Sequence, residues 1–543
     1  MNSMSASLGT YTAEVEKTLA SLSQQDMMGR IWRKDYTVWK PQPTEITDRL
    51  GWLTVTDLMR KRIPAFRSFT WEIKIAGFRH VVLLGMGGSS LGAEVLRQVF
   101  GRAPGYPELI VLDSVMPAAV QAVTKAIDPQ HTLFLVSSKS GTTTEPLTLF
   151  LYFQNLVAAR AGKKQATQNF VAITDPGTPL ANTAEKEGFR QVFLNPPDIG
   201  GRYSVLSYFG LVPAVLLGVD ISVLLDHADR AREGCASSVP ARENPAAWLG
   251  ACLGTLAKQG RDKLTLITSP SLSSFGLWVE QLVAESTGKE GKGIIPVVGE
   301  PLTEPAAYGD DRLFIYLRRE DDNNAVTDAA VESLKTAGQP VIIRKLAHLY
   351  ELGAEFFQWE LATAVAGAIL GINPFDQPDV QRAKDATQHF LHKFAATGRP
   401  FTMSKSGHLD NMLTQAREGK YLAVMAYLRQ SPELDGLLTH FRRKIVERYH
   451  IATTLGYGPR FLHSTGQLHK GGPNTGLFLQ ITAARGTDLP IPGQTYTFGT
   501  VADAQALGDF EALQAAHRQV VRIHCPQDSE RAVVTCLAGE LGV

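Results

Sequence analysis

The sequence predicts an α/β protein whose parallel sheets are covered by helices on both faces. Short, continuously apolar runs such as "HVVLLG" at 80–85 and "TLFLV" at 132–136 recur along the chain, and helix-like segments follow them. Strands that are buried on both faces appear as continuous apolar runs, and their alternation with helices is typical of parallel sheets. The chain has 543 residues, so more than one such domain is expected.

The expected elements can be placed in order along the chain. Residues 1–70 form a polar, helical N-terminal segment, and residues 71–220 a first unit with strands at "VVLLG", "ELIVLD", "TLFLV", "FVAIT" and "QVFLN". Residues 221–390 form a second unit, which opens with helices and continues with strands at "KLTLIT", "RLFIYL" and "PVIIRKL". Residues 391–543 are less regular, and a helical portion followed by "LFLQIT" and "QVVRIHC" predicts an additional α/β region.

Composition argues against several classes of function. The formal net charge of +1 provides no broad field for nucleic acid or a membrane surface. The four cysteines form no C-x-x-C pair and no zinc-like spacing, which favours a reducing compartment. The N-terminus lacks the basic and apolar regions of a signal peptide, and the apolar stretches are too short or too interrupted to span a bilayer. We therefore expect a soluble, cytoplasmic protein with no nucleic-acid or membrane partner.

The run "VSSKSGTTTEP" at 136–146 carries six hydroxyl side chains between a strand and a helix. Hydroxyls and the free N–H groups of a helix N-terminus bind phosphate oxygens, whereas helix capping alone would need only one or two such side chains. The loop "GMGGSSLG" at 85–92 follows the preceding strand, and its glycines do not fit the G-x-G-x-x-G dinucleotide fingerprint. No P-loop motif is present either, so we predict a site for a phosphate on a small molecule.

Two further stretches carry candidate catalytic residues. In "DIGGRYS" at 198–204, Arg202 follows two glycines and could stabilise developing negative charge, but a surface ion pair would have the same spacing. In "EQLVAESTGK" at 280–289, Gln281 and Glu285 are four residues apart and share one helix face. Glu285 is placed in the last turn and suits a general base, although most helix glutamates are solvated.

The stretch "GINPFDQ" at 371–377 is followed by Lys384. If a helix begins after Pro378, Lys384 lies two turns along it, on the same face as Gln377. A lone lysine in such a position is usually a solvated charge, so spacing alone assigns it no role.

Together these stretches resemble the phosphoglucose isomerase family, which is built from two SIS (sugar isomerase) domains. The matches are "GMGGSSLG", "SKSGTTTEP", "GGRYSVLS", "EQLVAESTGK", "GEP" and "GINPFDQP", in the family order over about residues 80–385. The resemblance implies two SIS-type, flavodoxin-like domains of three layers each. The whole sequence looks closest to the type that is also found fused behind transaldolase, although this chain has no room for a transaldolase barrel.

The resemblance implies reversible conversion of glucose 6-phosphate to fructose 6-phosphate through ring opening and a cis-enediolate, a step of glycolysis and gluconeogenesis. Glu285 would move a proton between C2 and C1, Arg202 would stabilise the enediolate, and Lys384 would assist ring opening. No cofactor or metal is implied, and a homodimer is expected from the resemblance alone. The residues expected to bind the substrate are Gly88, Ser89, Ser138, Lys139, Ser140, Thr142, Thr143, Gly201, Gln281 and Gln377.

The chain departs from the family pattern at one place that matters for the reaction. Family members carry a ring-opening histidine shortly after "GEP", supplied by the neighbouring subunit, whereas residues 299–318 of this chain hold no histidine. The C-terminal region contains "RFLHSTGQLHKGG", and we hypothesise that His463 or His469 takes over, because histidine best suits acid–base chemistry at neutral pH. The alternative is that both are structural or solvated.

Two other functions stay open at this point. One is a broader aldose–ketose isomerase that also uses mannose 6-phosphate. The other is a non-catalytic SIS sensor of sugar phosphates, which would need the phosphate loop but not Glu285, Arg202 and Lys384 together. Such sensors usually add a nucleic-acid-binding domain, and the sequence has neither a basic patch nor a helix-turn-helix signal.

Overall fold

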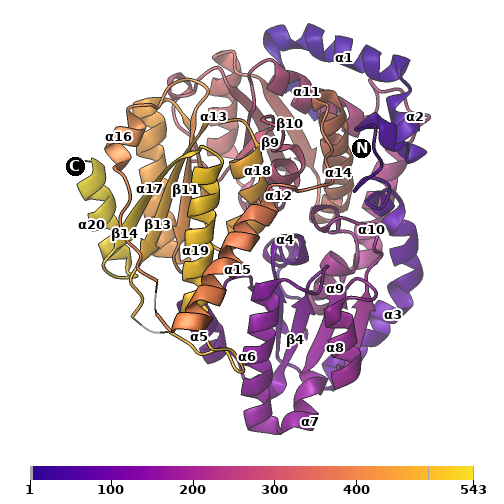
Figure 1. Ribbon diagram of the computed structural model, residues 1–543. Helices are drawn as coiled ribbons and strands as arrows, with labels where there is room; N and C mark the ends of the chain where they lie inside the picture. Colours follow the sequence, from indigo (N-terminus) through magenta and orange to yellow (C-terminus); the bar gives the residue numbers. More distant parts are fainter. Residues whose placement is uncertain (1–3, 400, 487, 542–543) are drawn as a thin grey trace.

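The computed structural model describes residues 4–399, 401–486 and 488–541, which form three sheets packed between helices (Figure 1). Among the described strands, every pairing is parallel except that of β1 with β10. The predicted α/β class with parallel sheets is therefore confirmed. The domain boundaries proposed from the sequence stay predictions, and we describe the chain by its sheets.

The first sheet has the strand order β3-β2-β4-β5-β6. Its strands are β2 (His80–Gly85), β3 (Glu108–Leu112), β4 (Thr132–Ser137), β5 (Phe170–Thr174) and β6 (Gln191–Leu194). Alternate side chains of β2 enter two different apolar cores, so both faces of the sheet are covered. The strand that follows β2 in the chain, β3, lies on one side of it, and the next strand, β4, lies on the other, so the strand order reverses at β2. A ligand crevice is expected at such a point, at the carboxyl ends of β2 and β4, where the glycine-rich and hydroxyl-rich loops lie.

The second sheet has the order β1-β10-β9-β7-β8, so its parallel strands repeat the arrangement of the first. They are β7 (Lys263–Thr268), β8 (Ile295–Val298), β9 (Arg312–Arg319) and β10 (Val341–Leu346). The N-terminal segment, expected to be helical, also contributes the edge strand β1 (Met4–Ser7), which pairs antiparallel with β10. A four-residue strand is too short to show a periodic pattern of its own.

Helices cover these two sheets and join them. The N-terminal helices are α1 (Thr12–Gln24), α2 (Met27–Trp32) and α3 (Val55–Ile75), the last of which runs into the first unit. The other helices of the first unit are α4 (Leu91–Phe100), α5 (Pro117–Ala126), α6 (Thr144–Ala161), α7 (Lys163–Ala166), α8 (Pro179–Glu187) and α9 (Tyr208–Leu217). Those of the second unit are α10 (Ile221–Gly234), α11 (Pro245–Lys258), α12 (Phe275–Thr287), α13 (Ala325–Thr336) and α14 (Leu352–Leu370). Helix α14 is buried on nearly all sides, packed against α10, α11 and α12. In the described part of the chain, neither it nor another helix is long and apolar enough to cross a membrane.

The third sheet lies in the C-terminal region and has the order β12-β11-β13-β14. Its strands are β11 (Tyr421–Tyr427), β12 (Ala452–Tyr457), β13 (Gly476–Ala483) and β14 (Gln519–Cys525). The helices are α15 (Val380–Thr397), α16 (Leu409–Leu413), α17 (Pro432–Tyr449), α18 (Gly466–Gly471), α19 (Phe498–Ala515) and α20 (Glu530–Leu541). We call α16 to α20 with this sheet the third domain; α15 leads into it and packs beside α19 (Figure 1).

The region was therefore predicted only in part. Strands β13 and β14 were expected, whereas β11 and β12 were missed. The order of the four strands repeats that of the first two sheets, with the first strand flanked by the second and the third.

Candidate active site

The hydroxyl-rich loop lies between β4 and α6, at the carboxyl edge of the first sheet. Ser138 Oγ donates to Thr143 Oγ1 (3.1 Å) and accepts from the Gly141 N–H (3.2 Å), and the hydroxyls of Ser140 and Thr142 lie 3.0 Å apart. Thr143 is the N-cap residue of α6, but its hydroxyl makes no capping hydrogen bond. Capping therefore does not explain the hydroxyls, and the uncapped N-terminus of α6 suits an anion.

The glycine-rich loop after β2 lies beside this loop and beside the arginine loop. Ser137 Oγ donates to the Ser89 carbonyl (2.9 Å), which ties the first two loops together. A Cβ on Gly88 would lie 2.0 Å from the Gly201 carbonyl oxygen, so these two backbones are in direct contact. Glycine at 88 is what permits this approach, and the structure thus brings the predicted residues Gly88, Ser89 and Gly201 together.

Arg202 is buried, with 3% of the residue exposed, which rules out the surface ion pair considered from the sequence. Its guanidinium donates to Ser286 Oγ (2.9 Å) and Gln377 Oε1 (2.7 Å) and to the carbonyls of Pro374 (2.9 Å) and Asp376 (2.8 Å). Nη1 also lies 3.4 Å from Glu285 Oε1. Five hydrogen bonds to these four partners hold this cation against the carboxylate.

Gln281 and Glu285 lie on one face of α12, as their spacing predicts. Gln281 Nε2 donates to Glu285 Oε2 (3.0 Å) and to the His463 carbonyl (2.9 Å). Gln281 Oε1 is buried, and among the described residues it has no hydrogen-bond partner. An acceptor of this kind is costly to leave unpaired, and a sugar hydroxyl could satisfy it. Gln281 therefore connects the predicted base with the third domain.

His463 meets a carboxylate of the phosphate loop. Its Nε2 lies 2.8 Å from Glu145 Oε1, and Gln505 Nε2 donates to the same oxygen (2.6 Å). Burial by itself raises the pKa of the Glu145 carboxyl, but attraction to a protonated His463 and the hydrogen bonds bring that pKa below its ordinary value. Sequence reasoning missed Glu145 and Gln505. Glu145 stands inside the quoted loop, but its partner is 318 residues away.

Two predicted residues have partners other than those expected. His469 is 4% exposed and packs between the rings of Phe461 and Phe478, and burial lowers the pKa of its imidazole well below the ordinary value. A neutral core histidine does not fit the acid–base role, so His463 alone is kept as the candidate. Lys139 is paired with Asp175 and donates to the Pro197 carbonyl (3.2 Å), which ties its ammonium to the end of β5.

A cavity of about 340 Å³ is lined by the hydroxyl-rich loop, α15 and the third domain. Its lining includes Ser140, Thr142, Thr143, Glu145, Lys384, His463, Lys470 and Gln505. Helix α15 begins at Val380, so Lys384 lies in its second turn and Gln377 precedes the helix. The predicted shared helix face is therefore wrong, although Lys384 does line the cavity.

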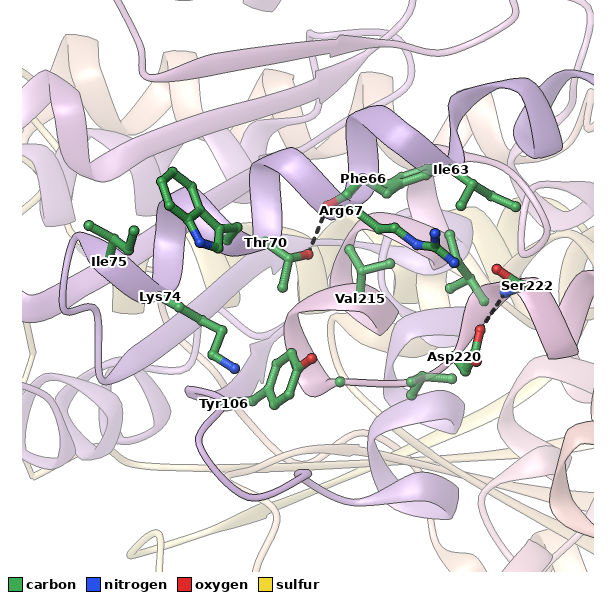
Figure 2. Close-up of a pocket in the computed structure, with 14 residues that line it drawn as sticks. Ile63, Phe66, Arg67, Thr70, Lys74, Ile75, Tyr106, Val215, Asp220 and Ser222 are labelled. Atoms are coloured by element: carbon green, nitrogen blue, oxygen red, sulfur yellow. Dashed lines mark hydrogen bonds between the residues drawn. The ribbon is translucent and has the colours of Figure 1, made fainter.

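A larger cavity of about 630 Å³ lies away from these residues, between α3 and the start of α10 (Figure 2). Its lining includes Phe66, Arg67, Lys74, Tyr106 and Asp220. Figure 2 shows the Asp220 carboxylate bonded to the backbone of Ser222, where it caps α10. None of the predicted site residues lines this cavity, and its one carboxylate is engaged in capping. The smaller cavity is lined by hydroxyls of the phosphate loop, Lys384 and His463, whereas Glu285 and Arg202 are not among its lining residues. Gln281 connects the two groups, because it donates to Glu285 and to the His463 carbonyl.

Comparisons with known proteins identify the family of the chain. Residues 51–299 match the family model "Phosphoglucose isomerase". Glucose-6-phosphate isomerase of Staphylococcus saprophyticus is 31% identical over 411 residues, which are 68% of this chain and 91% of that protein. The Staphylococcus aureus enzyme (strain NCTC 8325) is 30% identical over 399 residues, 65% of this chain and 88% of that protein.

Solved structures give the same answer for the fold. A hypothetical protein of Thermus thermophilus superposes with a TM-score of 0.60 and 25% identity, over 71% of this chain and all of the other. A glucose-6-phosphate isomerase of Chlamydia trachomatis superposes with a TM-score of 0.60 at 19% identity, over 70% of this chain and 86% of that one, and this shows the fold alone. On the sequence matches, this chain belongs to the phosphoglucose isomerase family.

Proposed function

We propose that this protein interconverts glucose 6-phosphate and fructose 6-phosphate. The observation that supports this most directly is the Glu285 carboxylate held 3.4 Å from the buried Arg202 guanidinium. Proton transfer next to a carbonyl needs a base, and the enediolate that forms needs a fixed positive charge. The similarity to glucose-6-phosphate isomerases at about 30% identity supports the same reaction.

In this mechanism the phosphate binds the hydroxyls of Ser140, Thr142 and Thr143 at the start of α6. Ring opening moves the proton of the anomeric hydroxyl to the ring oxygen, and His463, assisted by Lys384, performs this exchange. Glu145 accepts the hydrogen bond of one imidazole nitrogen, which leaves the other to exchange the proton.

Isomerisation follows on the open chain. Glu285 removes the proton from C2, the electron pair moves onto the carbonyl oxygen, and Arg202 stabilises the resulting enediolate. Glu285 then returns the proton to C1 while a proton moves between the two oxygens, so atoms and charge balance. Gln281 holds the Glu285 carboxylate and Gln377 holds the Arg202 guanidinium in position for these transfers.

The two other functions considered from the sequence have less support. A sensor does not need a base held against a cation, so the Glu285–Arg202 pair favours an enzyme. Four statements stay proposals from the sequence: use of mannose 6-phosphate, the likeness to the type found fused to transaldolase, the absence of a cofactor and a cytoplasmic location.

The test is a coupled assay from fructose 6-phosphate to glucose 6-phosphate, with wild type and Glu285→Gln side by side. We expect the variant to lose about 10²-fold or more of its turnover while binding a sugar-phosphate inhibitor as before. Equal rates would remove Glu285 as the base. Mannose 6-phosphate in the same assay measures the breadth of the substrate range.

A further inference from the structure

We propose that a single chain forms the entire active site, because its own third domain supplies the groups that a neighbouring subunit would otherwise have to bring. The inference rests on the proposed function. The group that a second subunit would be expected to supply comes from the C-terminal part of the same chain. Three independent contacts fix the third domain, which carries His463, against the other two sheets, and His463 itself makes the first of them.

The first contact is made at the cavity itself. Glu145 of α6 accepts hydrogen bonds on one oxygen from His463 (2.8 Å) and Gln505 (2.6 Å), and both donors belong to the third domain. Near it, the Arg460 guanidinium makes two bonds to the Asp113 carboxylate, at 2.7 and 2.8 Å, and the Asp113 side chain is 3% exposed. A paired, buried carboxylate of this kind is costly to leave without its cation.

The second contact uses the segment in which the family histidine was expected and is missing. Glu300 binds Arg312 within that segment (2.8 Å), and its other oxygen accepts from the N–H (2.6 Å) and hydroxyl (2.9 Å) of Thr453 on β12. Arg442 on α17 donates to the carbonyls of Val298 (3.0 Å) and Gly299 (2.9 Å). The stretch after "GEP" thus serves to dock the third domain, and β12 leads from there directly to His463.

The third contact is apolar and extends over both neighbouring sheets. Ala284, Ile295 and Val297 of the second unit share one buried cluster with Tyr421, Met425 and Phe478 of the third sheet. Phe498 and Val501 of α19 lie in the apolar core of the first unit, where the Phe498 ring contacts Tyr152 at 5.6 Å. Because closely packed cores do not open without a large cost, the third domain is a fixed wall of the site.

In these contacts the histidine position is filled from within the same chain. The position facing Glu145 is filled by the chain's own His463, and Gln281 of the second unit holds the same segment through its carbonyl. A second copy could provide this residue only if the third domains were exchanged between chains with the same contacts. A dimer, which the resemblance leads one to expect, is then not needed for turnover.

Mixing two inactive variants distinguishes a site built within one chain from a site shared between subunits. Glu285→Gln lies in the second unit and His463→Ala in the third domain, and the two are co-expressed with different tags and purified together. If each chain builds its own site, the mixed preparation has no more activity than the mean of the two variants alone. If the site is shared between subunits, random pairing restores one intact site in half of the dimers, about a quarter of the wild-type rate, and the proposal is overturned. Wild type is assayed in parallel, so failure of the isomerase proposal is visible separately.

A second measurement does not depend on activity. Asp113→Cys with Arg460→Cys places one thiol on each side of the contact between the first unit and the third domain. With a short bis-maleimide, we expect the two sites to be joined in a product that migrates at the mass of one chain, and the two single variants serve as controls. A product of twice that mass, joined through the same two peptides, would show that third domains are exchanged and would refute the proposal.

Discussion

Replacing Glu145 by glutamine tests whether the carboxylate behind His463 takes part in turnover. Between a carboxylate and an imidazolium at 2.8 Å, the attraction is about 6 kcal/mol at an effective dielectric constant of about 20, before desolvation is subtracted. Glutamine keeps the size and a hydrogen-bonding oxygen but removes the charge. General acid–base groups contribute about 10²- to 10⁴-fold, so we expect kcat to fall about 10²-fold, or about 2.7 kcal/mol.

The assay is steady-state isomerisation of cyclic glucose 6-phosphate, with the melting temperature measured on the same samples. Gln505→Ala is the matched control, because it removes the other donor to Glu145 and leaves the charge pair in place. We expect a smaller loss of kcat from the control than from Glu145→Gln. If Glu145→Gln stays within about threefold of wild type in kcat, the pairing is structural and His463 is not the ring-opening group.

Three further results are expected. Thr143→Val should raise KM for the sugar phosphate about tenfold with little change in melting temperature, since this hydroxyl does not cap α6; a lower melting temperature with unchanged KM would restore the capping explanation. Gly88→Ala should destabilise the fold by about 1–3 kcal/mol, because its Cβ would lie 2.0 Å from the Gly201 carbonyl oxygen, whereas Gly201→Ala has open space and should be mild; equal thermal shifts would contradict this. Burial raises the pKa of Glu280 from 4.5 to about 7, so the folded state retains a proton that the unfolded state has lost, and wild-type stability falls as pH rises through that window. The melting temperature of Glu280→Gln relative to wild type should therefore increase from pH 5 to pH 8, and a constant difference would count against the shift.

The features that the sequence predicted correctly are local ones. A continuous apolar run followed by a helix-like segment marks a strand of a parallel sheet wherever it occurs, so the α/β class, the strands of the first sheet and three strands of the second follow from short windows. The four-residue strands β1 and β8 were not predicted. The position of the hydroxyl loop follows in the same way, because it directly succeeds one such strand. The shared face of Gln281 and Glu285 depends only on helical periodicity.

The features that only the tertiary structure decided join segments far apart in the chain. The two histidines of "HSTGQLH" stand six residues apart, yet one meets Glu145 and the other is buried between Phe461 and Phe478. Lys139 lies within the phosphate motif, but its ammonium is paired with the Asp175 carboxylate, at the end of the next strand. Which partner a polar side chain finds depends on how the sheets pack, since a buried charge must be paired wherever the fold places it, and no local pattern carries that information.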